Sequence, residues 1–171
     1  MSDPDLELVF RPYKSFRIGN GIDVHALVPN RDLVIGGIKI DHDLGSDGHS
    51  DGDVLIHSIM DAILGAINKG DIGDHFPSSD NSFKGANSLE LLRTLYNKYL
   101  KSQWDIVNID STIVLQNPPI KPYVESMINK ITSVLSIEAS QLTIKATTTD
   151  HLGFIGKEEG IAAFTVCMLC K

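Results

Sequence analysis

The stretch DVLIHSIMDAILGAINK spans residues 53–69 and has the pattern of a helix. Its apolar side chains recur at the three-to-four spacing of a helix, at Val54, Ile56, Ile59, Met60, Ile63, Leu64 and Ile67. Asp53, His57 and Asp61 recur at four-residue steps, so they stack on one face. Gly70 predicts the end of the helix. The stretch therefore predicts an otherwise aliphatic helix that carries one polar stripe.

Strand-like and helical patterns alternate on both sides of this helix. Strands are expected over residues 16–25, 33–40, 104–115, 141–147 and 161–169. Further helices are expected over 88–101 and from Pro119 or Lys121 to about 135. Residues 41–52 and 70–87 are loops by composition, and residues 1–15 form an N-terminal tail. The alternation predicts one α+β domain over 16–171, with an about four-stranded mixed sheet covered by helices on one face.

Composition excludes several classes of protein. With 171 residues, 42% hydrophobic and 22% charged, the chain is neither collagen-like, coiled-coil nor disordered. Its net charge of -7 lacks the broad positive field that attracts nucleic acid or anionic lipid, so neither partner is expected. No apolar run approaches the roughly 20 residues of a membrane span, and the acidic opening is unlike a signal peptide. We therefore expect a soluble cytoplasmic protein.

The two cysteines do not indicate a metal or redox site. Cys167 and Cys170 lie in the last five residues, without the second pair that a zinc ribbon needs. They also lack the helix start that activates a redox pair. We expect reduced thiols on a terminal strand.

The acidic residues are unevenly distributed. Of 22 acids, 16 are Asp, and nine of these lie in residues 41–80, together with four of the six histidines. Asp favours caps, loops and metal sites over helix interiors, so this enrichment marks a turn-rich surface or a metal centre.

The spacing of three of these residues suits a metal centre, although other interpretations stay open. Asp23 and His25 are two apart at a strand end and point to one side, although such a pair alone also occurs as a surface or polar cluster. Asp53 could simply cap the helix and Asp61 could be solvated, but a His between two carboxylates also suits a metal ligand oriented by an acid. Asp23, His25 and His57 make a plausible three-ligand set that leaves one position open, as catalytic zinc sites do.

A third feature is the segment KATTTD, residues 145–150. Three hydroxyls and successive backbone amides can donate to phosphate oxygens, and Asp150 offers a hard oxygen ligand for magnesium or manganese. Threonines are also ordinary strand residues. Gly19-Asn-Gly21 lacks the third glycine of a dinucleotide fingerprint, and no phosphate loop of the Gly-Lys-Ser/Thr type occurs.

Together these segments resemble the 2-C-methyl-D-erythritol 2,4-cyclodiphosphate synthase family of the non-mevalonate isoprenoid pathway. The resemblance runs from Phe16 almost to the C-terminus. Its motifs are Arg17-Ile-Gly-x-Gly-x-Asp-Val-His25, His49-Ser-Asp-Gly-Asp-x-x-x-His57, Gly70-Asp-Ile-Gly73 with Phe76-Pro77, Phe83-Lys-Gly-Ala-Asn-Ser88, and Lys145-Ala-Thr-Thr-Thr with Leu152-Gly-Phe154 and Glu159-Gly-Ile161.

The resemblance implies a homotrimer with active sites between subunits and a divalent metal, usually zinc, held by Asp23, His25 and His57. It implies conversion of 4-diphosphocytidyl-2-C-methyl-D-erythritol 2-phosphate to the 2,4-cyclodiphosphate with release of CMP. Magnesium or manganese would accompany the substrate diphosphate at Asp150, where the family usually carries Glu. By the same similarity, His49 and Ser50 would position the methylerythritol phosphate.

The remaining implied roles belong to substrate contacts and to support of the metal ligands. Thr147 and Thr148 would contact the diphosphate, and Asp71 would lie near the ribose hydroxyls. Asp61 could orient His57, with Asp53 beside it. The other implied substrate contacts are Gly73, Lys84, Pro118, Lys145, Phe154 and Lys157.

Two other functions stay open at this point. A metal-dependent phosphohydrolase would use the same ligands to activate water instead of a substrate phosphate. A structural metal or nucleotide-binding module would bind without turnover. Product analysis separates the cyclase from the hydrolase, and a lack of turnover with bound metal would favour the module.

Overall fold

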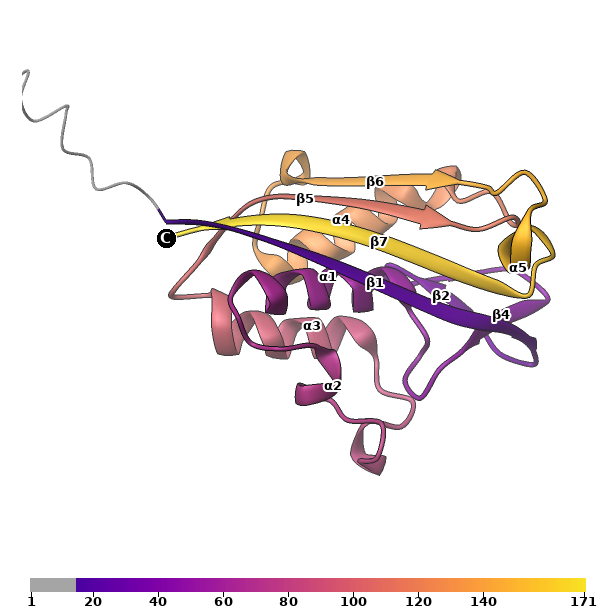
Figure 1. The fold of residues 1–171 in the computed structure, drawn as a ribbon, viewed down its shortest axis with the longest axis horizontal. Coiled ribbons are helices and arrows are strands. Elements are labelled where there is room, and N and C mark those ends of the chain that lie inside the picture. Colours follow the sequence, from indigo (N-terminus) through magenta and orange to yellow (C-terminus); the bar gives the residue numbers. More distant parts are fainter. Residues whose placement is uncertain (1–14) are drawn as a thin grey trace, which may run out of the picture.

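The main sheet has five strands in the order β4-β1-β7-β5-β6, in the computed structural model, which describes residues 15–171 (Figure 1). The strands are β1 Phe16–Pro29, β4 Leu44–Asp47, β5 Asp105–Val114, β6 Leu142–Thr147 and β7 Gly160–Cys170. Neighbours are antiparallel except β5 and β6, which are parallel and joined through helix α4 Val124–Leu135. A parallel pair requires a crossover connection, which contains α4 here. Because the sheet has both parallel and antiparallel neighbours, it is mixed, as predicted.

The strand count and two boundaries differ from the prediction of about four strands. Residues 33–40 form a hairpin of their own, β2 Leu33–Ile35 and β3 Ile38–Ile40. Gly36 and Gly37 form its turn with φ of 59° and 71°, values that a two-residue hairpin turn requires and that glycine adopts readily. Strand β4 lies within the predicted loop 41–52, where it pairs with the end of β1.

The predicted helices are confirmed, with changes at their ends. They are α1 Val54–Ala66, α3 Ser88–Leu95 and α4, and α3 continues as a π-helical turn over Tyr96–Leu100. The predicted loop 70–87 contains the short helices α2 Ile72–His75 and η1 Asn81–Phe83, and α5 Gly153–Gly156 precedes β7. As predicted, the helices lie on one face of the sheet: α1 and α4 pack against its strands, and α3 packs against these two helices (Figure 1).

Helix α1 lies unusually close to β1, because glycines face it. A β-carbon on Gly19 would stand 1.9 Å from the Ala62 carbonyl oxygen, and one on Gly21 would stand 2.0 Å from that of Ser58. Asp23 and His25 follow on the same side of the strand, since alternate residues share a face. The glycines therefore let β1 present Asp23 to the buried face of α1.

A chain of buried hydroxyls ties α1 to the centre of the sheet. Thr165 of β7 lies 2.8 Å from Ser58 of α1 and 2.8 Å from Ser111 of β5, joined in each case through their hydroxyl oxygens. All three side chains are buried. Because buried hydroxyls are costly unless paired, this chain fixes the position of α1 along β7.

The opposite face of the sheet carries exposed apolar side chains. Ile18 and Ile22 of β1 and Phe164 and Val166 of β7 are each 45–67% exposed, and Ile22 stands opposite Phe164. A continuous exposed apolar surface of this kind is typical of an interaction site.

The N-terminal tail lies outside the described residues, except for Ser15, whose backbone pairs with that of Lys171. Both cysteines are buried, and burial raises the pKa of Cys167 to about 11. In residues 15–171 no helix combines the length and the apolar character needed to cross a bilayer. The cytoplasmic location stays a prediction.

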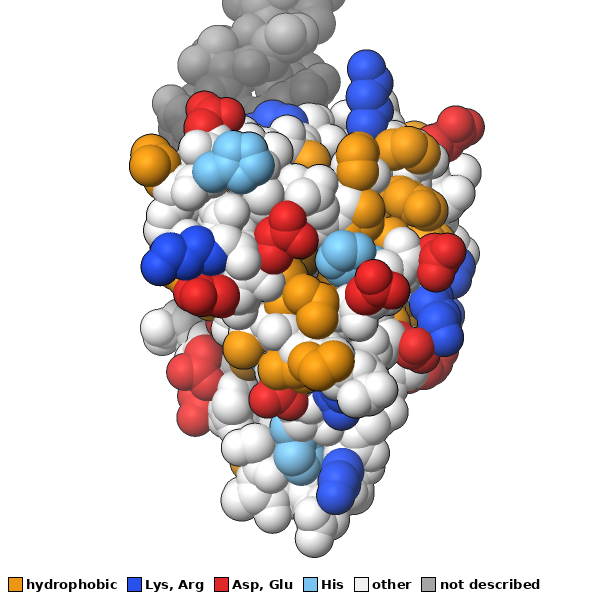
Figure 2. All heavy atoms as spheres, turned by 90° about the vertical axis from the view of Figure 1, so that its right-hand side faces the viewer, with side chains coloured by type: hydrophobic (Ala, Val, Ile, Leu, Met, Phe, Trp, Pro, Cys, Tyr) orange, Lys and Arg blue, Asp and Glu red, His pale blue; other side chains and the backbone are white. Residues whose placement is uncertain are grey.

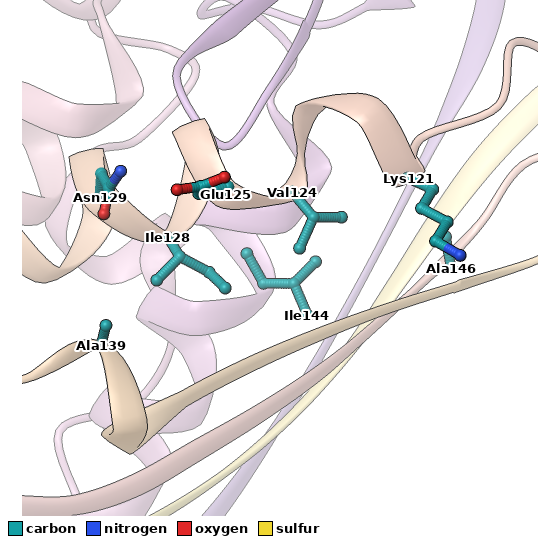
Figure 3. Close-up of a pocket in the computed structure, with 8 residues that line it drawn as sticks. All are labelled: Lys121, Val124, Glu125, Ile128, Asn129, Ala139, Ile144 and Ala146. Atoms are coloured by element: carbon teal, nitrogen blue, oxygen red, sulfur yellow. The ribbon is translucent and has the colours of Figure 1, made fainter.

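An apolar groove of about 650 Å³ separates α4 from the edge strand β6. Figure 3 shows Val124 and Ile128 of α4 above Ile144 of β6. Lys121 and Ala146 lie at one end of the groove, and both also line a second cavity beside the loop that follows β5.

Candidate metal centre

The three predicted metal ligands meet at one point. Oδ2 of Asp23 lies 3.0 Å from Nε2 of His25 and 2.9 Å from Nδ1 of His57. These donor atoms all lie within 4.8 Å of one another. One carboxylate and two imidazoles form a donor set typical of catalytic zinc sites, which keep a fourth position open. The residues present therefore fit a divalent metal.

The electrostatics of the cluster keep Asp23 ionised. Burial would raise the pKa of Asp23, but the hydrogen bonds and charges of His25 and His57 outweigh it and hold the pKa well below its usual range. The hydrogen bond that His25 donates to Asp23 raises the pKa of His25, against the effect of burial. In the metal-free protein, a proton on His25 thus helps to compensate the carboxylate, as a bound cation would otherwise do.

Each imidazole is oriented by a partner on its other nitrogen. Nδ1 of His25 donates to the backbone carbonyl of Asp47 at 2.8 Å, which leaves Nε2 to bind a metal. Nε2 of His57 lies 3.1 Å from the Ser50 hydroxyl, which leaves Nδ1 for the same ion. The outer partners therefore leave Nε2 of His25 and Nδ1 of His57 to face the same ion.

A cavity of about 230 Å³ opens beside this cluster. The predicted residues His49, Ser50 and Gly73 line it together with all three metal ligands. Asp71 lies just outside, where its carboxylate caps α2 by accepting from the Asp74 amide at 3.2 Å. The structure thus brings these predicted phosphate and ribose contacts to the metal centre.

Sequence reasoning missed the apolar wall of the cavity. Phe76 and Phe83 line it and pack edge to face with their ring centroids 5.3 Å apart, and Ile72 and Leu91 also line it. The available signal was the presence of two aromatic residues in an otherwise polar loop.

The two further carboxylates of the polar stripe bind backbone amides, and for Asp53 this is the capping role that the sequence left open. Asp53 is fully buried and caps α1, accepting from the amides of Ile56, Gly36 and Gly37 at 3.1, 2.9 and 2.7 Å, and burial raises its pKa. Asp53 is connected to His57 through the backbone, since its carbonyl oxygen accepts from the His57 amide at 3.0 Å in the first turn of the helix.

Asp61 was expected to orient His57, but its carboxylate accepts from the Ile72 amide at 2.7 Å. Asp61 therefore anchors the start of α2. It does not orient His57, because the two ring nitrogens of His57 already face Asp23 and Ser50. Burial raises the pKa of Asp61.

The predicted phosphate and base contacts form a second cluster. Pro118, Thr147 and Thr148 line a cavity of about 230 Å³ at the carboxyl ends of β5 and β6. The Thr148 hydroxyl lies 3.3 Å from Oδ1 of Asp150. Within the described chain, this cavity shares no lining residue with the metal centre. The two halves of the predicted site are therefore separate in one chain.

The remaining predicted contacts are exposed. Lys145 forms an ion pair with Asp110 of β5, with Nζ 2.6 Å from Oδ1. Lys84 follows η1, while Phe154 lies in α5 and Lys157 follows it. In residues 15–171 these four side chains line neither of the two cavities. The surface in Figure 2 shows acidic, histidine and apolar side chains interspersed, with lysine and arginine scattered.

Comparisons with known proteins agree on one family. The family model described as YgbB family matches residues 16–170. A curated 2-C-methyl-D-erythritol 2,4-cyclodiphosphate synthase from Clostridioides difficile (strain 630) is 52% identical over 153 residues, covering 90% of this chain and 95% of that protein.

Two solved structures have the same fold. The CDP complex of IspF from Plasmodium falciparum is 36% identical with a TM-score of 0.80, covering 92% of this chain and 97% of that chain. The bifunctional IspDF from Campylobacter jejuni is 42% identical with a TM-score of 0.88. That match covers 93% of this chain, which spans 43% of the longer bifunctional chain.

Proposed function

The chain belongs to the YgbB family, and on that premise we propose that it is a 2-C-methyl-D-erythritol 2,4-cyclodiphosphate synthase. Its substrate is then 4-diphosphocytidyl-2-C-methyl-D-erythritol 2-phosphate, and its products are the cyclic diphosphate and CMP. This is a phosphorus–oxygen lyase reaction of isoprenoid precursor biosynthesis. The observation that carries the proposal is the convergence of Asp23, His25 and His57 beside a cavity lined by His49 and Ser50.

The reaction is an intramolecular phosphoryl transfer. An oxygen of the 2-phosphate attacks the β-phosphorus, a new P–O bond forms, and the P–O bond to CMP breaks as CMP leaves with the bonding electrons. Folding the substrate so that these atoms lie in line supplies the proximity advantage, and no protein nucleophile is needed. When bound, zinc at the three ligands would act as a Lewis acid on the β-phosphate, and magnesium or manganese at Asp150 would offset the charge of the leaving group.

The residues of this chain bind and orient the reacting groups. Asp23, His25 and His57 hold the cation, and the Asp47 carbonyl and the Ser50 hydroxyl keep the two rings turned toward it. His49 and Ser50 position the 2-phosphate, since both line the cavity of the metal centre. Thr147 and Thr148 contact the diphosphate, and the loop around Pro118 receives the cytosine. Asp71 and Gly73 lie at the ribose, and Lys84, Lys145, Phe154 and Lys157 complete the substrate contacts.

A homotrimer would complete the active site. The metal centre and the Pro118–Thr148 cavity are lined by different residues of one chain. In the proposal, a neighbouring subunit brings its own Pro118–Thr148 cavity to the metal centre. The exposed apolar face formed by Ile18, Ile22, Phe164 and Val166 supplies a surface for such an assembly. We include the trimer, with active sites between subunits, in the proposal.

Product analysis tests the proposal against a metal-dependent phosphohydrolase. The cytidine substrate should yield CMP and the cyclic diphosphate in equal amounts, because ring closure expels CMP once per turnover. Asp23→Asn should abolish both products. Release of a linear phosphate or inorganic phosphate instead would favour the hydrolase, and metal binding without any product would favour a structural module.

A further inference from the structure

We propose that Arg31 is a positioning residue for the metal centre. Its guanidinium holds residues 46–50, the segment whose atoms orient both metal-binding imidazoles. The inference rests on the proposed function, because it concerns the ligands of the same cation. Arg31 lies after the end of β1, and its hydrogen bonds go to backbone carbonyls and to neither His25 nor His57.

The guanidinium binds three backbone carbonyls of this segment. Nε donates to the Ser46 oxygen at 3.3 Å, and Nη2 donates to the Gly48 and Ser50 oxygens at 2.6 and 3.3 Å. The planar fork of arginine suits such multiple recognition, whereas a lysine ammonium is a single point charge. Within the described residues Arg31 forms no ion pair, so its role is that of a hydrogen-bond donor to this backbone.

The same segment carries the outer partners of both imidazoles. The Asp47 carbonyl accepts from Nδ1 of His25 at 2.8 Å, and the Ser50 hydroxyl lies 3.1 Å from Nε2 of His57. The backbone of Gly48 also packs on His25, since a β-carbon there would stand 3.1 Å from Cε1 of the ring. Arg31 therefore fixes residues 46–50, and these residues in turn orient the imidazoles of His25 and His57.

Strand β4 brings the Arg31 backbone close to this segment. A β-carbon on Gly45 would stand 2.4 Å from the Arg31 carbonyl oxygen, so glycine is needed where the chain of Arg31 crosses β4. Gly45 directly precedes the held segment. The backbone of Arg31 thus lies close to the start of the segment that its guanidinium holds.

Removal of Arg31 should loosen the segment without removing a metal ligand. The rings would lose the fixed partners that set their tautomers and orientations. Loss of such outer partners typically weakens metal binding by 10- to 100-fold. We expect about a tenfold loss of zinc affinity, since the partners themselves remain in the chain.

Hydrogen–deuterium exchange of the metal-free protein tests the first step. Arg31→Ala should speed amide exchange in residues 46–52 and leave α4 as protected as in the wild type, with Arg31→Lys intermediate. Arg93→Ala removes an exposed arginine that pairs with Glu90 and is the matched control. Unchanged exchange in Arg31→Ala, or an equal rise along the whole chain, would overturn the proposal.

Zinc titration against a chromogenic chelator tests the second step. Arg31→Ala should bind zinc about tenfold more weakly than the wild type or Arg93→Ala. Because Arg31 acts partly through Ser50, the double variant with Ser50→Ala should lose less affinity than the product of the two single losses. Wild-type zinc affinity in Arg31→Ala, or fully multiplicative losses, would contradict the inference.

These readouts separate the inference from the proposed reaction. If the wild type released no CMP while Arg31→Ala still loosened residues 46–52 and weakened zinc binding, the proposed reaction would fail and the role of Arg31 would stand. If the wild type formed the cyclic product and Arg31→Ala matched it in exchange and zinc affinity, only the role of Arg31 would fail.

Discussion

Gly21 lies directly against the backbone of Ser58, so that a β-carbon on the glycine would stand 2.0 Å from the Ser58 carbonyl oxygen. Ser58 follows the proposed metal ligand His57 in α1, and Gly21 precedes the proposed metal ligand Asp23 by two residues in β1. This contact therefore sets how closely the two elements bring Asp23 and His57 together.

Gly21→Ala should separate α1 from β1, because neither backbone can accommodate the added methyl group. Overpacking of this kind costs about 1–3 kcal/mol of unfolding free energy, and zinc affinity should fall with it. Urea denaturation and zinc titration measure the two effects. Gly65→Ala is the control, since the nearest atom to its added carbon lies 3.9 Å away, and it should leave zinc affinity intact. Equal zinc affinity in the Gly21 and Gly65 variants would contradict this account.

The Asp23–His25 pair predicts a pH-dependent stability of the metal-free protein. Burial would raise the pKa of Asp23, but the two imidazoles lower it below its ordinary value of 3.8. The free energy that the ionised Asp23 contributes to folding is therefore present above pH 3.8 and is lost as the pH falls through the pKa of Asp23 in the folded protein. The hydrogen bond that His25 donates to Asp23 raises the pKa of His25. The free energy that this bond contributes to folding is therefore present below pH 6.5 and is lost as the pH rises through the pKa of His25 in the folded protein.

The stability difference between the wild type and Asp23→Asn should therefore be largest between about pH 4 and 6.5. Urea denaturation in the presence of a chelator, from pH 3 to 9, measures it. Zinc affinity should change in the opposite sense above this range, tightening as His25 loses its proton. A difference between the two proteins that does not vary with pH would argue against the pairing.

The Cys167 thiol should be unreactive in the folded protein. Burial raises its pKa to about 11, so almost no thiolate is present near pH 8. In a Cys170→Ser background, a disulfide reagent should modify the remaining thiol only after denaturation. Rapid modification of the native protein would show that the strand end bearing Cys167 opens.

Much of the metal centre was predictable, because its residues obey short-range periodicities. The two-residue spacing of Asp23 and His25 and the helical period around His57 each place a side chain on a known face. Their convergence on one cation could be proposed, although the close contact of Gly21 with Ser58 was not visible in the sequence.

Other features depend on partners distant along the chain. Residues 33–40 are mostly apolar before and after Gly36 and Gly37. A single strand and a two-stranded hairpin would both have this pattern, so the sequence could not distinguish them. Strand β4 is mostly small and polar and exists through pairing with β1. Asp61 and Arg31 bind backbone groups, the Ile72 amide and the carbonyls of residues 46–50, and backbone groups leave no residue pattern to recognise.

Anomalous diffraction at the zinc absorption edge, from crystals of the zinc-loaded protein, tests the shared cation most directly. The account predicts one zinc per chain bound by a carboxylate oxygen of Asp23, Nε2 of His25 and Nδ1 of His57, at about 2.0–2.2 Å from each. Zinc bound elsewhere, or bound here without His57, would contradict it.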